Sequence, residues 1–302
     1  MIGRGPGIGV PAAADAFRAL GVLCEPPADG GARVAAALGL PGAPDPSDYT
    51  DLFILELYPY ASVYLGPEGM LGGEARDRVA GFWRALHLVP PAEPDHLAAL
   101  LGLYAVLVER DAGEHDPARR LLWRRARATL VWEHLASWLL PYVDRLDAIA
   151  PPFYQAWGGV LREAVLQEAA AAGFPDALPA HLRAAPPLPD PRREGSGPFV
   201  AGLLAPVRSG VILTRADLVR CARDLELGMR VGERKFALAA LISQAPAAVL
   251  GWLAGEATVC SEGHARYADV AGIVARFWAD RAAAAATLLE ELRVSAAESA
   301  AG

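Results

Sequence analysis

Helical periodicity runs along nearly the whole chain. Apolar residues recur at intervals of three and four in most segments, and no stretch sustains the two-residue alternation of a half-buried strand. Proline and glycine stand at the joints between these segments. The pattern therefore predicts an all-α protein built as a helical bundle.

One apolar stripe is especially regular and places a helix after residue 94. Its positions follow the spacing of a buried helical face: Leu97, Leu100, Leu101, Tyr104, Leu107 and Val108. We expect Glu93 to cap this helix and Pro94 to take its first position. Asp95 would then lie at the exposed edge of the first turn, where its carboxylate meets the positive end of the helix dipole. His96 falls at the margin of the stripe, and the pattern alone favours a structural role for this pair over a site.

A second long helix is expected to begin with Asp116 as its cap and Pro117 in its first position. From Ala128 onward, apolar residues point in almost every direction around this helix, which predicts a place in the centre of the bundle. Glu133 and His134 would then be buried, at a cost of about 1–3 kcal/mol for each one that lacks a hydrogen bond. We therefore expect these two side chains either to have partners or to border a groove.

Three further features of this region carry expectations. Pro141 should kink or end the second helix, and Gly173 should end the next one. The early turns of the second helix are rich in arginine, which is typical of a solvated face, with phosphate binding as the alternative. These residues are Arg119, Arg120, Arg124, Arg125 and Arg127.

Shifts in composition divide the chain into four parts. Residues 1–46 are rich in Gly, Pro and Ala and are expected to form a flexible, loosely attached extension with one short helix near residues 12–21. Residues 47–173 form the helical core, residues 174–207 a proline-rich linker, and residues 208–295 a further helical region. We expect the linker to be the preferred site of limited proteolysis.

Composition narrows the possible functions. The chain has 302 residues and a net charge of −7, which disfavours nucleic acid as the partner and favours a basic one. Its longest apolar runs fall well short of a membrane span, and its first residues make a poor export signal, so a cytoplasmic protein is expected. Three scattered cysteines, Cys24, Cys221 and Cys260, predict buried thiols and no disulfide framework.

The spacings of common catalytic, phosphate and metal sites are absent. Glu133 and His134 would suit an inverted zinc motif, but that motif needs a histidine where Leu130 stands. Cys260 and His264 have no further ligand nearby in the sequence. Neither a phosphate-binding GxxxxGK[ST] nor a GxSxG nucleophile motif occurs. We therefore expect a protein that is not an enzyme and that carries no metal or other cofactor.

Several short motifs follow one another between residues 48 and 172. They are "ASVYL" and "MLGG", then "EPDHLAALLGLY", then "EHLASWLLPYVDRL" and "PPFYQAW". In this order and spacing the chain resembles the TorD/DmsD/NarJ family of chaperones for molybdenum-containing reductases. The "PDHL" stretch resembles the family's acid-plus-histidine motif, and "HLASWLLPY" resembles its later histidine, tryptophan and aromatic motif. The amino-terminal extension and the region after residue 173 depart from the family pattern.

The resemblance implies a cytoplasmic TorD-like chaperone with an additional carboxy-terminal helical region. Such a protein binds the twin-arginine leader, or the apo catalytic subunit, of a molybdoenzyme and holds it until its cofactor is inserted. The resemblance also raises the case for a functional role of the motif residues. The client-binding residues it implies are Tyr64, Pro94, Asp95, His96, Leu97, Glu133, His134 and Trp138.

The carboxy-terminal region offers a rival hypothesis. Residues 213–243 predict two short helices joined by a turn at Gly228, the first with a capping box formed by Thr214 and Asp217. Two such helices with several arginines could form a helix-turn-helix in a DNA-binding regulator. Acidic residues offset most of that positive charge, however, whereas a surface that binds phosphates should be plainly basic. The alternative function is therefore kept below the chaperone.

Overall fold

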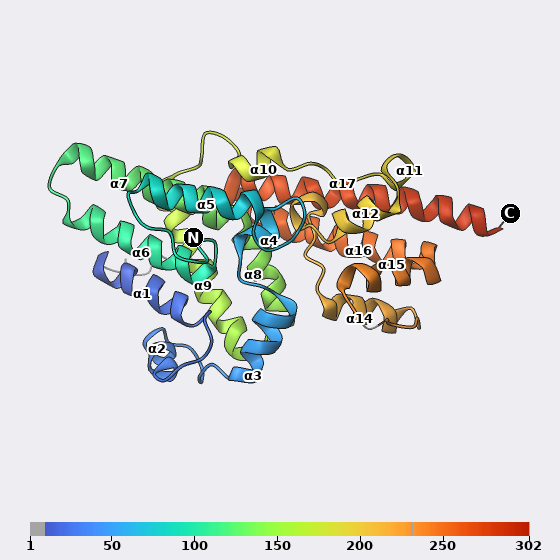
Figure 1. Ribbon diagram of the computed structural model, residues 1–302, viewed down its shortest axis with the longest axis horizontal. Coiled ribbons are helices and arrows are strands. Elements are labelled where there is room, and N and C mark those ends of the chain that lie inside the picture. Colours follow the sequence, from blue (N-terminus) through green and yellow to red (C-terminus); the bar gives the residue numbers. More distant parts are fainter. Residues whose placement is uncertain (1–9, 231, 302) are drawn as a thin grey trace.

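The computed structural model describes residues 10–230 and 232–301, and every regular element in this part of the chain is a helix. The predicted all-α fold class is confirmed. The molecule is elongated, as Figure 1 shows. A hairpin of α6 (Leu97–Gly113) and α7 (Pro117–Thr129) projects at one end, and α17 (Ala268–Ala301) reaches the other.

The first of two hydrophobic cores is formed mainly by residues before 170. The helices around it include α6 and the elements η1 and η2, which are π-helical and therefore wider than an α-helix. Its other elements are α1 (Val10–Val22), α2 (Gly31–Ala37), α3 (Pro46–Tyr49), η1 (Thr50–Glu56), α4 (Ala61–Leu65), α5 (Gly73–Ala85), η2 (Leu130–Ala136), α8 (Ser137–Ile149) and α9 (Pro152–Ala172).

Helix α1 is an integral part of this core. It packs along α6 and buries Phe17 and Leu20, and the Trp157 indole donates a hydrogen bond of 3.1 Å to the Leu20 carbonyl oxygen. The expectation of a flexible, loosely attached extension is therefore wrong from residue 10 onward, and residues 1–9 lie outside the described part. The error arose because a composition rich in Gly, Pro and Ala conceals an apolar face with few large side chains.

Helices α7, η2 and α8 follow one another without a break from Pro117 to Ile149. Asp116 is the N-cap and Pro117 the first residue, as predicted, and the Asp116 carboxylate accepts the Arg119 N–H at 2.8 Å. Pro141 was expected to kink or to end this helix. It lies inside α8 and does not end it. The missing N–H of Pro141 leaves the Ser137 carbonyl without its helical donor, and the Trp278 indole supplies a hydrogen bond of 2.9 Å instead.

The second core is formed by residues from 199 onward. The segment predicted as a proline-rich linker carries three short helices and the start of a fourth, and it buries Phe199, Val200 and Leu203. The position of the domain boundary stays a prediction. Besides α17, the helices of this part are α10 (Ala180–Ala184), α11 (Pro191–Glu194), α12 (Ser196–Leu203), α13 (Pro206–Ser209), α14 (Arg215–Asp224), α15 (Arg234–Gln244) and α16 (Pro246–Ala265).

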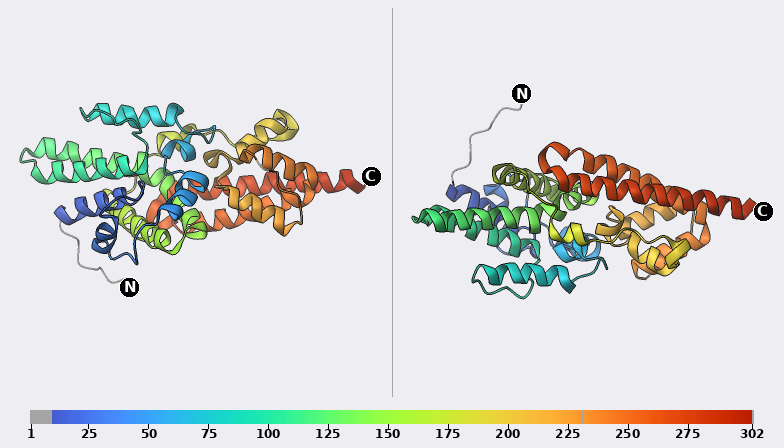
Figure 2. Two further views of the ribbon diagram at one scale, coloured as in Figure 1. Left: turned by 60° about the horizontal axis from the view of Figure 1, so that its bottom comes forward. Right: turned by 90° about the horizontal axis from the view of Figure 1, so that it is seen from above.

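Helix α17 belongs to both cores. Its first turns bury Trp278 in the first core, and its later turns bury Leu289 in the second, while α16 packs antiparallel along it (Figure 2). Gly210, which ends α13 with a φ of 74°, lets α13 approach α17 closely. A Cβ atom at this position would lie 2.3 Å from the Ala282 nitrogen, so only glycine fits.

Candidate functional site

The "PDHL" stretch forms a junction between two segments of the backbone. The Leu97 N–H donates to the Pro59 carbonyl at 2.8 Å, and the Ala61 N–H donates to the Asp95 carbonyl at 3.0 Å. This antiparallel bridge keeps residues 94–96 out of a helical conformation. The predicted start of the helix at Pro94 is therefore wrong: α6 begins at Leu97, and its N-cap is His96.

His96 performs the capping role that the sequence suggested for Glu93. Its Nδ1 accepts the Ala98 N–H at 3.1 Å, so the neutral ring carries its proton on Nε2. Burial lowers the pKa of His96, which favours this neutral form. The Tyr60 ring meets the imidazole edge-on at 4.7 Å, and the Tyr60 hydroxyl donates to the Glu93 carboxylate at 2.7 Å.

Asp95 serves a different helix from the one predicted. Its side chain is only 2% exposed, and Oδ2 accepts the Ser62 N–H at 3.1 Å, in the first turn of α4. The expectation that Asp95 lies at an exposed edge is therefore wrong. Pro94 and Leu97 are buried as well, so of the four residues in this motif His96 alone has substantial exposure.

A groove of about 650 Å³ opens beside the motif, between α1 and α6. Two exposed carboxylates, Glu25 and Glu93, stand at its edge, whereas the nearby Arg18 is neutralised by two contacts of 2.6 Å with Glu109. The rest of the groove is mainly apolar, and Gly21 lets α1 approach α6 there. The lining includes Gly21, Val22, Trp83, Pro91, Ala92, His96, Ala98, Ala99, Gly102 and Leu103.

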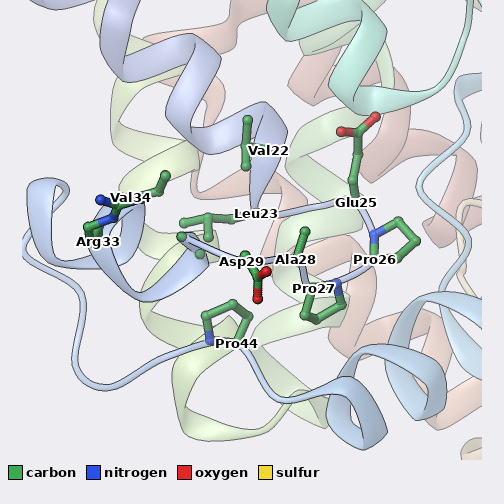
Figure 3. A pocket seen from close by; sticks show the side chains of 12 residues that line it. Val22, Leu23, Glu25, Pro26, Pro27, Ala28, Asp29, Arg33, Val34 and Pro44 are labelled. Carbon is green, nitrogen blue, oxygen red and sulfur yellow. The ribbon is translucent and has the colours of Figure 1, made fainter.

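A second hollow of about 280 Å³ adjoins this groove and shares Val22 and Glu25 with it. It lies between the end of α1 and α2, and its lining includes Pro26, Pro27 and Pro44, as Figure 3 shows. In that view the Glu25 side chain points to the opposite side of the loop from Asp29. No sequence pattern predicted this hollow, because α1 and α2 fall in the stretch interpreted as an extension.

The second motif is packed inside the bundle. Trp138 is fully buried, donates to the His134 carbonyl at 2.8 Å, and stacks on the buried Tyr64 with ring centroids 5.2 Å apart. The Glu133 carboxylate accepts the Ala180 N–H at 2.8 Å, at the start of α10. Glu133 is half-buried and has a hydrogen-bond partner, whereas His134 and Trp138 are buried, so the three residues do not form an open face.

His134 and His181 meet in the interior, between η2 and α10. Their ring centroids are 6.3 Å apart, and His134 Nδ1 and His181 Nε2 are both buried without a hydrogen-bond partner. Burial, and then the other histidine, lower the pKa of His134 to about 3. Burial, followed by the nearby Arg78, lowers the pKa of His181 to about 4. Both rings are therefore neutral at neutral pH.

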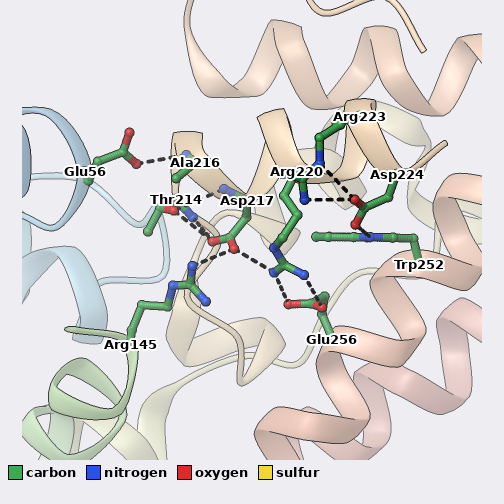
Figure 4. A network of polar contacts seen from close by, with 10 residues as sticks. All are labelled: Glu56, Arg145, Thr214, Ala216, Asp217, Arg220, Arg223, Asp224, Trp252 and Glu256. Atoms are coloured by element: carbon green, nitrogen blue, oxygen red, sulfur yellow. Dashed lines mark hydrogen bonds and ion pairs between the residues drawn. The ribbon is translucent and has the colours of Figure 1, made fainter. Parts of the chain in front are cut away.

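In the two helices of the rival hypothesis, Arg220 and Arg223 are paired with carboxylates. The predicted capping box is present, with the Thr214 hydroxyl and the Asp217 carboxylate exchanging hydrogen bonds with each other's backbone. Asp217 is buried and also binds Arg145 at 2.6 Å and Arg220 at 2.9 Å (Figure 4). Helices α14 and α15 are separated by residues 225–233, a longer connection than the three- or four-residue turn of a helix-turn-helix.

Neither a membrane span nor a metal cluster is found in the part of the chain that the structure describes. Within residues 10–230 and 232–301, each helix is too short or too polar to cross a bilayer. The same residues bring no three His, Cys, Asp or Glu side chains into an arrangement that could hold a metal ion.

Comparison with models of known protein families gives a match within the described part of the chain. Residues 46–144 match the model of a family described as the nitrate reductase delta subunit. The match covers α3 to α8, including both sequence motifs, and confirms the resemblance seen in the sequence. No curated protein matches the chain.

Proposed function

We propose, because residues 46–144 match the model of the nitrate reductase delta subunit family, which is part of the TorD/DmsD/NarJ chaperones, that this protein binds the leader peptide or the apo catalytic subunit of a molybdoenzyme. Members of this family are non-catalytic chaperones of molybdoenzyme assembly. In this proposal the protein acts in the cytoplasm and assists cofactor insertion, assembly or export of its client.

The groove between α1 and α6 is the observation that supports this proposal. A peptide with paired arginines followed by an apolar stretch would place its guanidinium groups at Glu25 and Glu93 and its apolar part against Val22 and Leu103. Charge-assisted hydrogen bonds would orient such a peptide, and the apolar contacts would provide most of the affinity. The chain's net charge of −7 also favours a basic partner.

The motif residues take different parts in this proposal. His96 lines the groove and can contact the client directly. Asp95 acts through the backbone, because its hydrogen bond to Ser62 and its bridge to Ala61 hold the groove's edge in place. Tyr64, Glu133, His134 and Trp138 would support the groove from inside the bundle without touching the peptide.

Calorimetry with a peptide bearing paired arginines and an apolar stretch tests this site. We expect Glu25→Gln and Glu93→Gln each to weaken binding by up to about fivefold at low salt, because an exposed ion pair contributes at most about 1 kcal/mol. Added salt should reduce this difference, since it screens exposed charges.

Glu163→Gln is the matched control, because this substitution also removes one negative charge. Glu163 is exposed on α9 and does not line the groove. It should leave the affinity unchanged. An equal loss in the control variant would show that net charge, and not the groove, attracts the peptide. No binding to the wild-type protein would reject this groove as the leader site.

A further inference from the structure

Two arginines on different helices face one groove in the carboxy-terminal part, outside the residues that match the family. Arg208 lies on α13 and Arg281 on α17, and the groove between them has a volume of about 350 Å³. The segment that connects α10 to α11 runs beside α17 here and supplies Pro187 and Leu188 to the groove (Figure 1).

Backbone carbonyl groups hold both guanidinium groups in place. Arg281 donates to the carbonyls of Pro186 and Ala185 at 2.8 and 3.1 Å, and Arg208 donates twice to the Pro187 carbonyl, at 3.2 Å each. The Arg281 guanidinium also lies over the Phe277 ring, 4.9 Å from its centroid. Both side chains are half-buried, so their orientations are fixed before any ligand arrives.

These contacts do not neutralise the two positive charges. Within residues 10–230 and 232–301, no carboxylate oxygen lies within 4.0 Å of either guanidinium. Burial, and then the charge of Arg208, lower the pKa of Arg281. Asp280 lines the same groove but is exposed and makes no ion pair with either arginine.

Several other half-buried arginines have a carboxylate partner within 3.3 Å, among them Arg127, Arg145, Arg162 and Arg220. Arg120 and Arg234 instead each donate to a single backbone carbonyl group, so what sets Arg208 and Arg281 apart is that two such arginines face one groove. Arg208 and Arg281 also hold the proline-rich segment against α17, but that role accounts for only part of their donors. Each guanidinium has five N–H groups, so both retain donors that the carbonyls do not use.

The walls of the groove indicate what kind of anion would fit it. Apolar side chains of α17 and of the segment before α11 line the groove beside the arginines, and an inorganic ion would make no use of them. They are Leu188, Phe277, Ala284, Ala285 and Leu288. The complementary ligand has an acidic group on an apolar body.

We propose that this groove binds a partner peptide in which an acidic side chain is flanked by apolar residues, with its carboxylate bridging Arg208 and Arg281. Planar guanidinium groups suit a carboxylate, because two parallel N–H donors match its two oxygens. The site is independent of the groove between α1 and α6, which has acidic edges and suits the opposite charge. The protein would thus hold a basic segment and an acidic segment at separate places.

Calorimetry of the full chain with two synthetic hexapeptides tests the proposal. One peptide carries a single glutamate among leucine and alanine residues, and the other carries glutamine in its place. We expect the glutamine peptide to bind more weakly than the glutamate peptide, by up to about tenfold. A loss of this size, about tenfold, corresponds to one lost charge-assisted hydrogen bond. Sodium phosphate, as a third ligand, should bind more weakly than the glutamate peptide because it leaves the apolar walls uncovered.

Variants connect the effect to the two arginines. The double variant Arg208→Gln and Arg281→Gln should remove the preference for glutamate, whereas Arg276→Gln, an exposed position on α17 outside the groove, should leave it unchanged. Arg208→Lys and Arg281→Lys keep the charge and should retain part of the preference, which provides a test even if the glutamine variant does not fold. Equal affinities for the two peptides, phosphate binding as tight as that of the glutamate peptide, or a preference that survives in the double variant would each overturn the proposal.

Discussion

At the scale of single residues, one absent N–H group organises the contact between α8 and α17. Pro141 cannot donate to the Ser137 carbonyl, and this carbonyl is deep in the protein, where an unpaired acceptor is costly. The Trp278 indole supplies the donor from a position 141 residues further along the chain. A helix-breaking residue therefore creates a specific binding point for another helix.

The Trp278 hydrogen bond can be measured by a double-mutant cycle. We expect Trp278→Phe to lower the free energy of unfolding by at least about 1–3 kcal/mol, because the Ser137 carbonyl loses its partner. Pro141→Ala restores a helical donor for that carbonyl, so Trp278→Phe should cost less in the Pro141→Ala background. Urea denaturation of the four proteins gives the coupling energy, and purely additive effects would contradict this account.

In the "PDHL" motif, too, the tertiary structure determines which backbone group each side chain binds. The sequence places an acid and a histidine side by side, and the fold gives each a different helix to cap: Asp95 serves α4 and His96 serves α6. The adjacent carboxylates that face solvent at the groove are Glu25 and Glu93. That Asp95, His96 and the other motif residues contribute to client binding stays a prediction.

At the scale of elements, α10 depends on two neutral histidines for its attachment to η2. His134 and His181 have pKa values lowered to about 3 and about 4, mainly by burial. Phe82 packs on His134, Glu133 binds the start of α10, and Glu74 and Arg78 are the charged groups closest to His181. Protonation would place a charge in this interior contact.

The stability of the protein should therefore depend on pH below neutrality. A histidine with a folded-state pKa below its unfolded value of about 6.5 stabilises the fold fully above that pH. Its contribution is lost as the pH falls from about 6.5 toward about 4, by up to about 1.4 kcal/mol per pH unit for each histidine. Urea denaturation at pH 7 and pH 5 should show this loss.

Substitutions identify the histidines that are responsible for the pH dependence. His134→Gln and His181→Gln should both reduce the difference in stability between pH 7 and pH 5, even where they lower stability overall. His115→Gln, at an exposed position between α6 and α7, is the control and should not change the difference. A pH dependence that is the same in all three variants would assign the effect to other groups.

At the scale of the whole molecule, a buried ion pair connects the two cores. Arg145 on α8 binds Asp217 on α14 at 2.6 Å, and Asp217 is 1% exposed. Arg220 joins the same carboxylate and continues to Glu256 on α16, as Figure 4 shows. Removing one member leaves a buried charge poorly compensated, which costs more than the pair itself contributes.

We expect Arg145→Met to lower the free energy of unfolding by about 3 kcal/mol or more, because Asp217 retains only Arg220 as its charged partner. Arg223→Met is the matched control, since its pair with Asp224 is exposed and its loss should cost less than about 1 kcal/mol. Thermal unfolding followed by circular dichroism measures both. Similar effects of the two substitutions would show that the buried network does not connect the cores.

Patterns within short stretches of the sequence were enough to predict the fold class and several helix ends. Helical periodicity, caps and helix ends depend only on residues that are close together in the sequence. The predictions based on them are correct: the all-α fold, the cap at Asp116, the capping box at Thr214 and the helix end at Gly173. The order of the motifs identified the family that the match over residues 46–144 confirms. These patterns depend on neighbouring residues or on the order of motifs along the chain, so they can be interpreted without the tertiary structure.

The surroundings of the candidate site residues depend on contacts between segments that are distant in the sequence. The bridge between residues 59–61 and 95–97 delays the start of α6, buries Asp95 and leaves His96 at a groove, and no local pattern marks it. The packing of α1 on α6 brings Glu25 to that groove, and the meeting of α13 with α17 brings Arg208 to Arg281. Backbone pairing and packing between distant segments override local capping preferences, because their partners lie tens of residues apart in the sequence.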